Sequence, residues 1–143
     1  FPRHWDVALP AARECNDLNR SLFLPTESRR FGTSHWLRFH GKSCLADWDK
    51  LYCRADPYET DGHYHKFSPL TYYERFQTPT LILHGERDQD VPVEQSHLFF
   101  RALKEKGVPT ELIIYPREFH AVVERDHILD MSRRVIGWLA RHL

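Results

Sequence analysis

The chain has 143 residues, a length that suits one domain of ordinary size. Hydrophobic residues make up 41% of it and aromatic residues 13%, a composition that excludes a disordered chain. Lys plus Arg and Asp plus Glu both total 20, so the formal net charge is zero. Because there is no basic excess, we expect no nucleic-acid partner. We also expect no membrane partner, because no apolar run is long enough to cross a bilayer.

Residues 1–31 differ from the rest of the chain, because they contain prolines and a polar stretch but no glycine. We leave this segment unassigned, with a short helix over Ala8–Leu24 as the one element it suggests. The chain starts at Phe1 without a signal-peptide pattern, which is typical of a fragment or a processed chain. The cysteines form no C-x-x-C pair, which predicts reduced thiols and favours the cytoplasm. They are Cys15, Cys44 and Cys53.

The segment from Gly32 to Pro69 is rich in aromatic residues and loop formers. A short helix is expected around Ala46–Leu51, and turns are expected at residues 56–58 and 60–62. His63 and His65 alternate as on one face of a strand and offer two imidazoles. No third ligand stands at a supporting spacing, so we do not expect a metal site.

From Thr80 onward the pattern is periodic. Short apolar runs predict buried strands over Thr80–His84 and Thr110–Tyr115. Between them an apolar stripe predicts a helix over Val93–Lys106 that stops at Gly107. A second stripe predicts a last helix from residue 126 or 127 to 142. A connection this short implies parallel strands with a right-handed crossover, so this half is a parallel β-α-β-α unit of α/β class.

Asp88 lies four residues past the first predicted strand, and His120 lies five residues past the second. Open α/β sheets build their sites at the carboxyl ends of parallel strands, so the two loops are expected to meet. An aspartate that accepts the Nδ1–H of a histidine is two thirds of a serine-hydrolase triad. We therefore predict Asp88 as the catalytic acid and His120 as the general base.

Four neighbours compete for roles in this site. Asp90 stands nearer the helix start and is better suited to capping the helix or bracing the loop. His84 ends its strand and is expected to be a packed histidine that hydrogen-bonds a loop. Arg117 and Glu118 flank His120, where a surface ion pair is favoured over a tuning role.

The nucleophile is the missing part, because the chain contains no G-x-S-x-G elbow. Ser43 follows Gly41 by two residues, but Leu45 stands where the second glycine should be. That glycine lets the elbow helix approach its strand, so Ser43 is disfavoured as the nucleophile. Residues 41–43 also end like a P-loop, but Trp36 replaces its first glycine, so no cofactor site is expected.

These residues resemble the C-terminal part of the prolyl oligopeptidase (S9) catalytic domain, most of all in its dipeptidyl-peptidase and acylaminoacyl-peptidase branches. The resemblance covers residues 32–143 and is specific from Ser68 onward. It is carried by residues 68–72 (SPLTY), 78–88 (TPTLILHGERD), 91–92 (VP), 95–96 (QS), 102–108 (ALKEKGV), 115–118 (YPRE) and 138–139 (WL).

The resemblance implies an α/β-hydrolase fold of which this chain holds the C-terminal portion, with an incomplete sheet. It carries Asp88 and His120 over as triad acid and base, while the elbow and the β-propeller of the family are absent. The family commonly shows Glu-Gly-His-Gly, whereas Phe119 and Ala121 stand at the glycine positions here. The implied substrate is a peptide or an acyl-peptide.

Three functions follow from this sequence. The first is a partial serine-type peptidase, inactive alone for lack of its serine. The second is a non-catalytic module, either a truncated pseudoenzyme or an interaction domain. The third is a carboxylic-ester hydrolase on the same fold. Because half a sheet leaves a strand edge unpaired, we also expect exposed apolar surface near Leu81–Leu83 and self-association.

Overall fold

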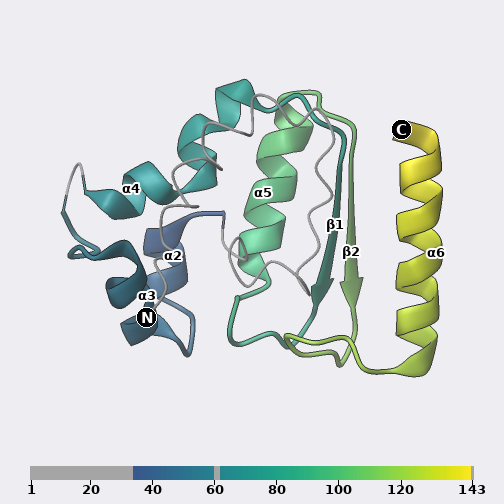
Figure 1. Ribbon diagram of the computed structural model, residues 1–143, viewed down its shortest axis with the longest axis horizontal. Coiled ribbons are helices and arrows are strands. Elements are labelled where there is room, and N and C mark those ends of the chain that lie inside the picture. Colours follow the sequence, from purple (N-terminus) through teal and green to yellow (C-terminus); the bar gives the residue numbers. More distant parts are fainter. Residues whose placement is uncertain (1–33, 60–61, 143) are drawn as a thin grey trace, which may run out of the picture.

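A computed structural model describes residues 34–59 and 62–142 of the chain. The unassigned segment, its predicted helix over Ala8–Leu24, Cys15 and the first two residues of the predicted 60–62 turn lie outside the described residues. The elements follow one another in Figure 1 as α2 (Trp36–His40), α3 (Ala46–Cys53), α4 (His63–Phe67), η1 (Pro69–Arg75), β1 (Thr80–Gly85), α5 (Glu94–Glu105), β2 (Thr110–Tyr115) and α6 (Arg125–His142).

The two strands pair in parallel, in a register that runs from Thr80 opposite Thr110 to Gly85 opposite Tyr115. They form a two-stranded sheet among the described residues, with α5 as the crossover between them and α6 after them. The predicted β-α-β-α unit is confirmed, with boundaries that differ by one or two residues. Gly107 ends the crossover helix region with a φ of +77°, a left-handed conformation that glycine adopts without strain.

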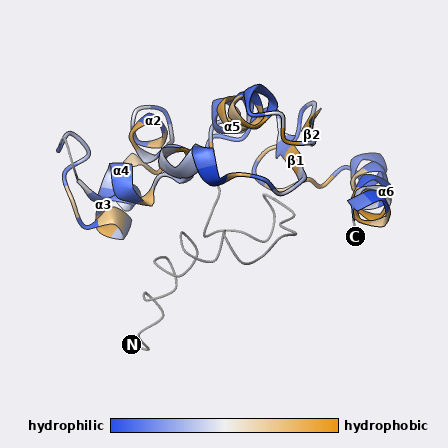
Figure 2. Cartoon of the chain, turned by 90° about the horizontal axis from the view of Figure 1, so that it is seen from above, coloured by the Kyte–Doolittle hydropathy of each residue, from blue (hydrophilic) through white to orange (hydrophobic). Residues whose placement is uncertain are grey.

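Helices cover both faces of the strand pair, and Figures 1 and 2 show α5 and α6 on different sides of it. On one face Leu81 and Leu83 pack with Tyr115 and with Trp138 of α6. On the other face Ile82 packs with Leu103 of α5 and with Val108. The side chains of Leu81, Ile82 and Leu83 are at most 1% exposed. The prediction that they form exposed apolar surface is therefore wrong, because each strand face has its own helix.

The helices α2, α3 and α4 form a separate cluster beside the strand unit, around Trp36, Phe39, Cys53 and Tyr64. Val91, which follows β1, packs into the same cluster and links the two parts. The predicted helix near residue 46 is confirmed as α3, and the turn at residues 56–58 is present. In the described part of the chain, no helix is both long and apolar enough to cross a membrane.

The strand predicted for the two histidines is wrong, because His63 and His65 lie in the short helix α4. His63 Nδ1–H donates to the carbonyl of Cys53 at 2.9 Å. Cys53 is a buried free thiol and Cys44 an exposed one, as expected for reduced cysteines.

Candidate active site

Two loops meet at the carboxyl end of the strand pair, because β1 and β2 are parallel and end in register. The acid loop (residues 86–93) leads from β1 to α5, and the base loop (residues 116–124) leads from β2 to α6. β1 is one residue longer than predicted, so Asp88 lies three residues past its end. His120 lies five residues past the end of β2.

The structure brings the two predicted residues together. His120 Nδ1–H donates to Oδ2 of Asp88 at 2.9 Å. The Asp88 side chain is 1% exposed, whereas the His120 side chain is 32% exposed. The second ring nitrogen, Nε2, makes no hydrogen bond to any described residue. A buried carboxylate therefore holds Nδ1 of a partly exposed imidazole, and no described residue bonds its other nitrogen.

Asp88 is itself fixed by the acid loop. Its Oδ1 accepts the backbone N–H of Val91 at 2.8 Å, and its Oδ2 lies 3.3 Å from Nε2 of His84. Burial by itself raises the pKa of Asp88, but hydrogen bonds from His84, Val91 and His120 outweigh it and hold the pKa below its ordinary value. The carboxylate is thus charged at neutral pH.

His84 is a packed histidine, as predicted. Its Nε2 lies 2.8 Å from the carbonyl oxygen of Val91, which can only accept, so Nε2 carries the proton. Nδ1 then accepts the hydroxyl of Ser96 at 2.5 Å. This buried chain ties the end of β1 and the first turn of α5 to the acid loop.

Asp90 braces the loop rather than capping α5. The helix is preceded by Val93, and no side chain caps it. The Asp90 carbonyl accepts the hydroxyl of Ser43 at 2.5 Å, and its carboxylate lies 3.3 Å from the thiol of Cys44. The capping role predicted as an alternative for Asp90 is therefore wrong, and the bracing role is present.

The acid and base loops lie in direct backbone contact. A Cβ built on Gly85 would stand 2.0 Å from the carbonyl oxygen of Phe119 and 2.7 Å from that of Glu118. The N–H of Arg87 donates to the same Glu118 carbonyl at 2.8 Å. Only a residue without a side chain fits between the loops at this point.

Glu118 is the residue whose role the sequence misjudged. It does not pair with Arg117 on the surface, since Arg117 bonds Glu124 at 2.7 Å and 2.9 Å. Glu118 is 1% exposed and accepts the N–H groups of Val123 and Glu124 and the ring of His127. The one sequence signal for this role was an acidic residue shortly before a helix start, where the helix dipole favours negative charge.

Phe119 and Ala121, which stand where the family commonly has glycine, are compatible with the backbone conformation of the base loop. Outside glycine, positive φ occurs among residues 34–59 and 62–142 at Arg54 and Arg117. Phe119 and Ala121 therefore replace the usual glycines without entering the left-handed region. The Phe119 side chain is 56% exposed and lines a pocket.

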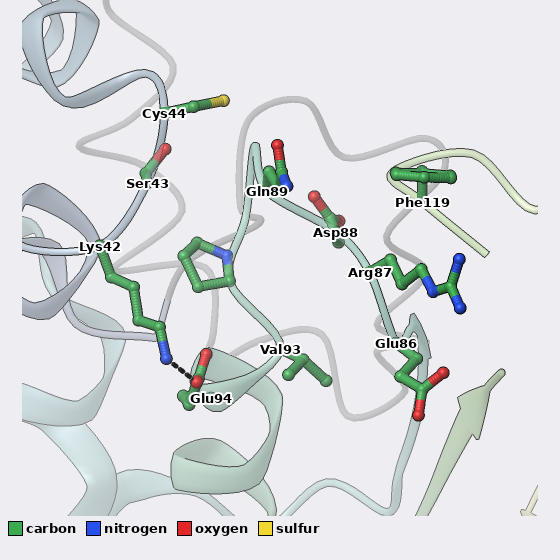
Figure 3. Close-up of a pocket in the computed structure, with 11 residues that line it drawn as sticks. Lys42, Ser43, Cys44, Glu86, Arg87, Asp88, Gln89, Val93, Glu94 and Phe119 are labelled. Carbon is green, nitrogen blue, oxygen red and sulfur yellow. Dashed lines mark hydrogen bonds and ion pairs between the residues drawn. The ribbon is translucent and has the colours of Figure 1, made fainter. Parts of the chain in front are cut away.

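An open pocket of about 640 Å³ adjoins the acid loop (Figure 3). Ser43 and Cys44 lie on one side of it, and Arg87 and Phe119 lie on the other. The Ser43 hydroxyl donates to the Asp90 carbonyl and accepts the Leu45 N–H at 2.9 Å. Because both contacts brace the backbone, Ser43 fits a structural role.

A second aspartate–histidine contact shows what distinguishes the first. In the cluster formed by helices α2, α3 and α4, His40 Nδ1–H donates to Asp49 at 3.0 Å and to the carbonyl of Ala46. The His40 side chain is 12% exposed and Asp49 is fully buried. This pair joins two helices, whereas the pair of Asp88 and His120 lies at the strand ends with an accessible ring.

One cluster of metal-ligand types occurs in the described part of the chain, formed by Glu118, Glu124 and His127. Both oxygens of Glu118 already accept hydrogen bonds from the chain, and Arg117 bonds Glu124. These contacts satisfy the carboxylates, so the cluster is better suited to holding the loop than to holding a cation.

A model of the prolyl oligopeptidase family matches residues 30–143. The chain belongs to the prolyl oligopeptidase family. Bacillus subtilis uncharacterized peptidase YuxL is 35% identical over 117 residues, which are 77% of this chain and 17% of YuxL. The acylamino-acid-releasing enzyme of Rattus norvegicus is 37% identical over 107 residues, 73% of this chain and 13% of that enzyme.

Among solved structures, an acylaminoacyl peptidase of Pyrococcus horikoshii superposes with a TM-score of 0.72 at 28% identity. It covers 78% of this chain, and this chain covers 19% of it. The prolyl oligopeptidase likeness establishes the α/β-hydrolase fold that the sequence predicted. This chain spans less than a fifth of the length of the curated relatives it matches.

Proposed function

We propose that this chain supplies the acid and the general base of a serine-peptidase triad, Asp88 and His120, for hydrolysis of peptide or acyl-peptide bonds. The observation that carries the proposal is the 2.9 Å hydrogen bond from Nδ1–H of His120 to a buried carboxylate, on a side chain that is 32% exposed and whose Nε2 no described residue bonds. Such a carboxylate selects the Nδ1–H tautomer and stabilises the imidazolium.

In this mechanism Nε2 of His120 takes the proton of a serine hydroxyl as the hydroxyl oxygen attacks the scissile carbonyl. It then gives that proton to the leaving amine, and the cycle repeats with water. Asp88 stays ionised throughout, which its lowered pKa supports. A carboxylic ester would use the same pair, so the peptide class rests on the relatives, which are peptidases by name.

The proposal includes a nucleophile outside this chain, because no serine here stands in a G-x-S-x-G elbow. The purified chain is therefore expected to be inert toward peptide substrates. A non-catalytic module is the competing function. A proton on Nε2 of His120 would contradict the triad role, because a general base needs a free Nε2 lone pair.

We expect a fluorophosphonate serine probe to leave the purified 143-residue chain unlabelled, with less than about 1% of the protein modified. The reason is that the Ser43 hydroxyl is bonded within the loop rather than to His120. Peptide mapping by mass spectrometry is the measurement, with Ser43→Ala and His120→Ala as matched variants. A stoichiometrically labelled serine that loses its label in His120→Ala would show a complete site within this chain.

We also propose self-association through the sheet edge. β1 is buried on both faces, as interior strands of parallel sheets are, yet it pairs with β2 alone among the described residues. Its other edge has no strand partner among residues 34–59 and 62–142, and an edge of this kind can pair with a second copy of the chain. Sedimentation velocity is expected to give about twice the monomer mass at about 100 μM. A monodisperse monomer with a cooperative melt would contradict this.

A further inference from the structure

The carboxylate of Glu118 is a buried anchor with three donors. Its Oε2 accepts the N–H of Val123 at 2.9 Å. Its Oε1 accepts the N–H of Glu124 and the Nδ1–H of His127, both at 2.8 Å. The Glu118 side chain is 2% exposed, so water does not compete for these bonds. No step of the proposed reaction uses this carboxylate.

These bonds close the part of the base loop that carries His120. Glu118 stands two residues before the histidine, and Val123 stands three residues after it. The carboxylate therefore joins the two ends of a segment of six residues whose middle holds the imidazole. Fixing both ends removes most of the backbone freedom with which His120 could move away from Asp88.

The backbone of Glu118 fixes the same segment to the acid loop. Its carbonyl accepts the N–H of Arg87, the residue directly before Asp88, at 2.8 Å. The neighbouring Phe119 carbonyl lies against Gly85. One residue thus connects the start of α6, the His120 segment and the Asp88 loop.

The charge of Glu118 suits this position. Burial by itself raises its pKa, but the bonds from Val123, His127 and Glu124 outweigh burial and hold the pKa below its ordinary value. Helix α6 begins at Arg125, so the carboxylate also lies at the positive end of the helix dipole. The Glu118 carboxylate is thus ionised at neutral pH, and both of its oxygens can accept hydrogen bonds.

We propose that Glu118 is the positioning residue of His120: its buried carboxylate ties the base loop to the start of α6 and holds the imidazole in line with Asp88. This inference rests on the proposed role of His120. It assigns no chemical step to Glu118, whose carboxylate bonds Val123, Glu124 and His127 rather than His120.

The test is the tautomer of His120 in the 143-residue chain, read from its ring ¹⁵N shifts at about pH 9, above the ordinary imidazole range. In the wild type the Nδ1–H tautomer is expected to predominate. In Glu118→Gln the amide offers a donor where Val123 needs an acceptor. We expect the ratio of Nδ1–H to Nε2–H tautomer to fall about tenfold.

Two further variants keep the test decisive. Glu124→Gln replaces a half-exposed carboxylate that bonds Arg117 and lies 3.6 Å from Nδ1 of His127. It keeps the backbone N–H of residue 124 and the other two donors of Glu118, so it should leave the tautomer ratio unchanged. His127→Phe removes one donor and keeps a ring beside Tyr115, whose centroid is 5.3 Å away. It should give an intermediate fall, and it decides the question if Glu118→Gln does not fold.

The outcomes are distinct. A folded Glu118→Gln protein with the wild-type tautomer ratio, even with a lower melting temperature, would overturn the positioning role and reduce Glu118 to a structural residue. An equal fall in Glu124→Gln would overturn it as well. A wild-type chain with Nε2–H predominant would instead contradict the proposed function of the Asp88–His120 pair.

Discussion

Replacing Gly85 by alanine is expected to destabilise the protein by about 3 kcal/mol or more. The added Cβ would stand 2.0 Å from the Phe119 carbonyl oxygen and 2.7 Å from the Glu118 carbonyl oxygen. Both are backbone atoms, so no side-chain rotation relieves the clash, and the base loop must move away from the acid loop. Urea unfolding at pH 7 gives the free energy, and the His120 ring shifts report whether the contact with Asp88 is lost.

Gly137 in α6 provides the matched control. It is exposed, and a Cβ built on it meets nothing within 4 Å. Alanine there is expected to stabilise the protein by about 0.5–1 kcal/mol, because glycine is a poor helix former. If Gly85→Ala were as stable as the wild type, the close approach of the two loops would be wrong.

Replacing Asp88 by asparagine is expected to cost about 2 kcal/mol of stability at pH 7 and to reverse the tautomer of His120. The amide can accept the Val91 N–H through its oxygen, but its NH₂ group then faces the rings of His120 and His84. Nδ1 of His120 becomes an acceptor and the proton moves to Nε2, which removes the lone pair that a general base needs. Urea unfolding and ring ¹⁵N shifts measure the two effects.

The pH dependence of that loss has a definite sign. The folded-state pKa of Asp88 is lower than its ordinary value of 3.8, so its ionised form stabilises the fold at pH values above about 4. This contribution is lost as the pH falls below 3.8 through the folded-state pKa. The wild type should therefore lose its advantage over Asp88→Asn in acid.

Asp90→Asn is the control for charge alone. Asp90 is two residues away in the same loop and contacts only the Cys44 thiol through its carboxylate among the described residues. We expect its stability to change by less than about 0.5 kcal/mol at any pH. A gap between Asp88→Asn and the wild type that stayed constant down to pH 2 would contradict the ionised, hydrogen-bonded carboxylate.

Much of the strand unit was readable from local pattern. The apolar runs of β1 and β2 and the stripe of α5 are short-range signals, and each connection is short enough to imply parallel strands. Parallel strands that end in register bring their following loops together, so the contact of Asp88 with His120 could also be predicted. The packed role of His84 followed from its place at a strand end.

Other roles depended on contacts with residues that are distant in the sequence, or were obscured by a misleading local pattern. His63 and His65 alternate like strand residues, but the short helix α4 packs Tyr64 between them into the α2–α4 cluster. The burial of Leu81–Leu83 depends on α5 and α6 closing over opposite faces. The hydrophobic periodicity of a strand does not specify how much of its surface will be covered by helices that follow it in the sequence.

The sequence by itself determined the family, the β-α-β-α order and the loops on which Asp88 and His120 lie. These follow from periodicity, turn residues and motif spacing, which are properties of neighbouring residues. Only the tertiary structure decided that Glu118 is buried rather than on the surface. It also decided that the backbone of Gly85 lies against the backbone carbonyls of Glu118 and Phe119. It also decided that the Ser43 hydroxyl is bonded to Asp90. The physical reason is that hydrogen bonding and steric exclusion act between atoms brought together by packing, which sequence spacing does not specify.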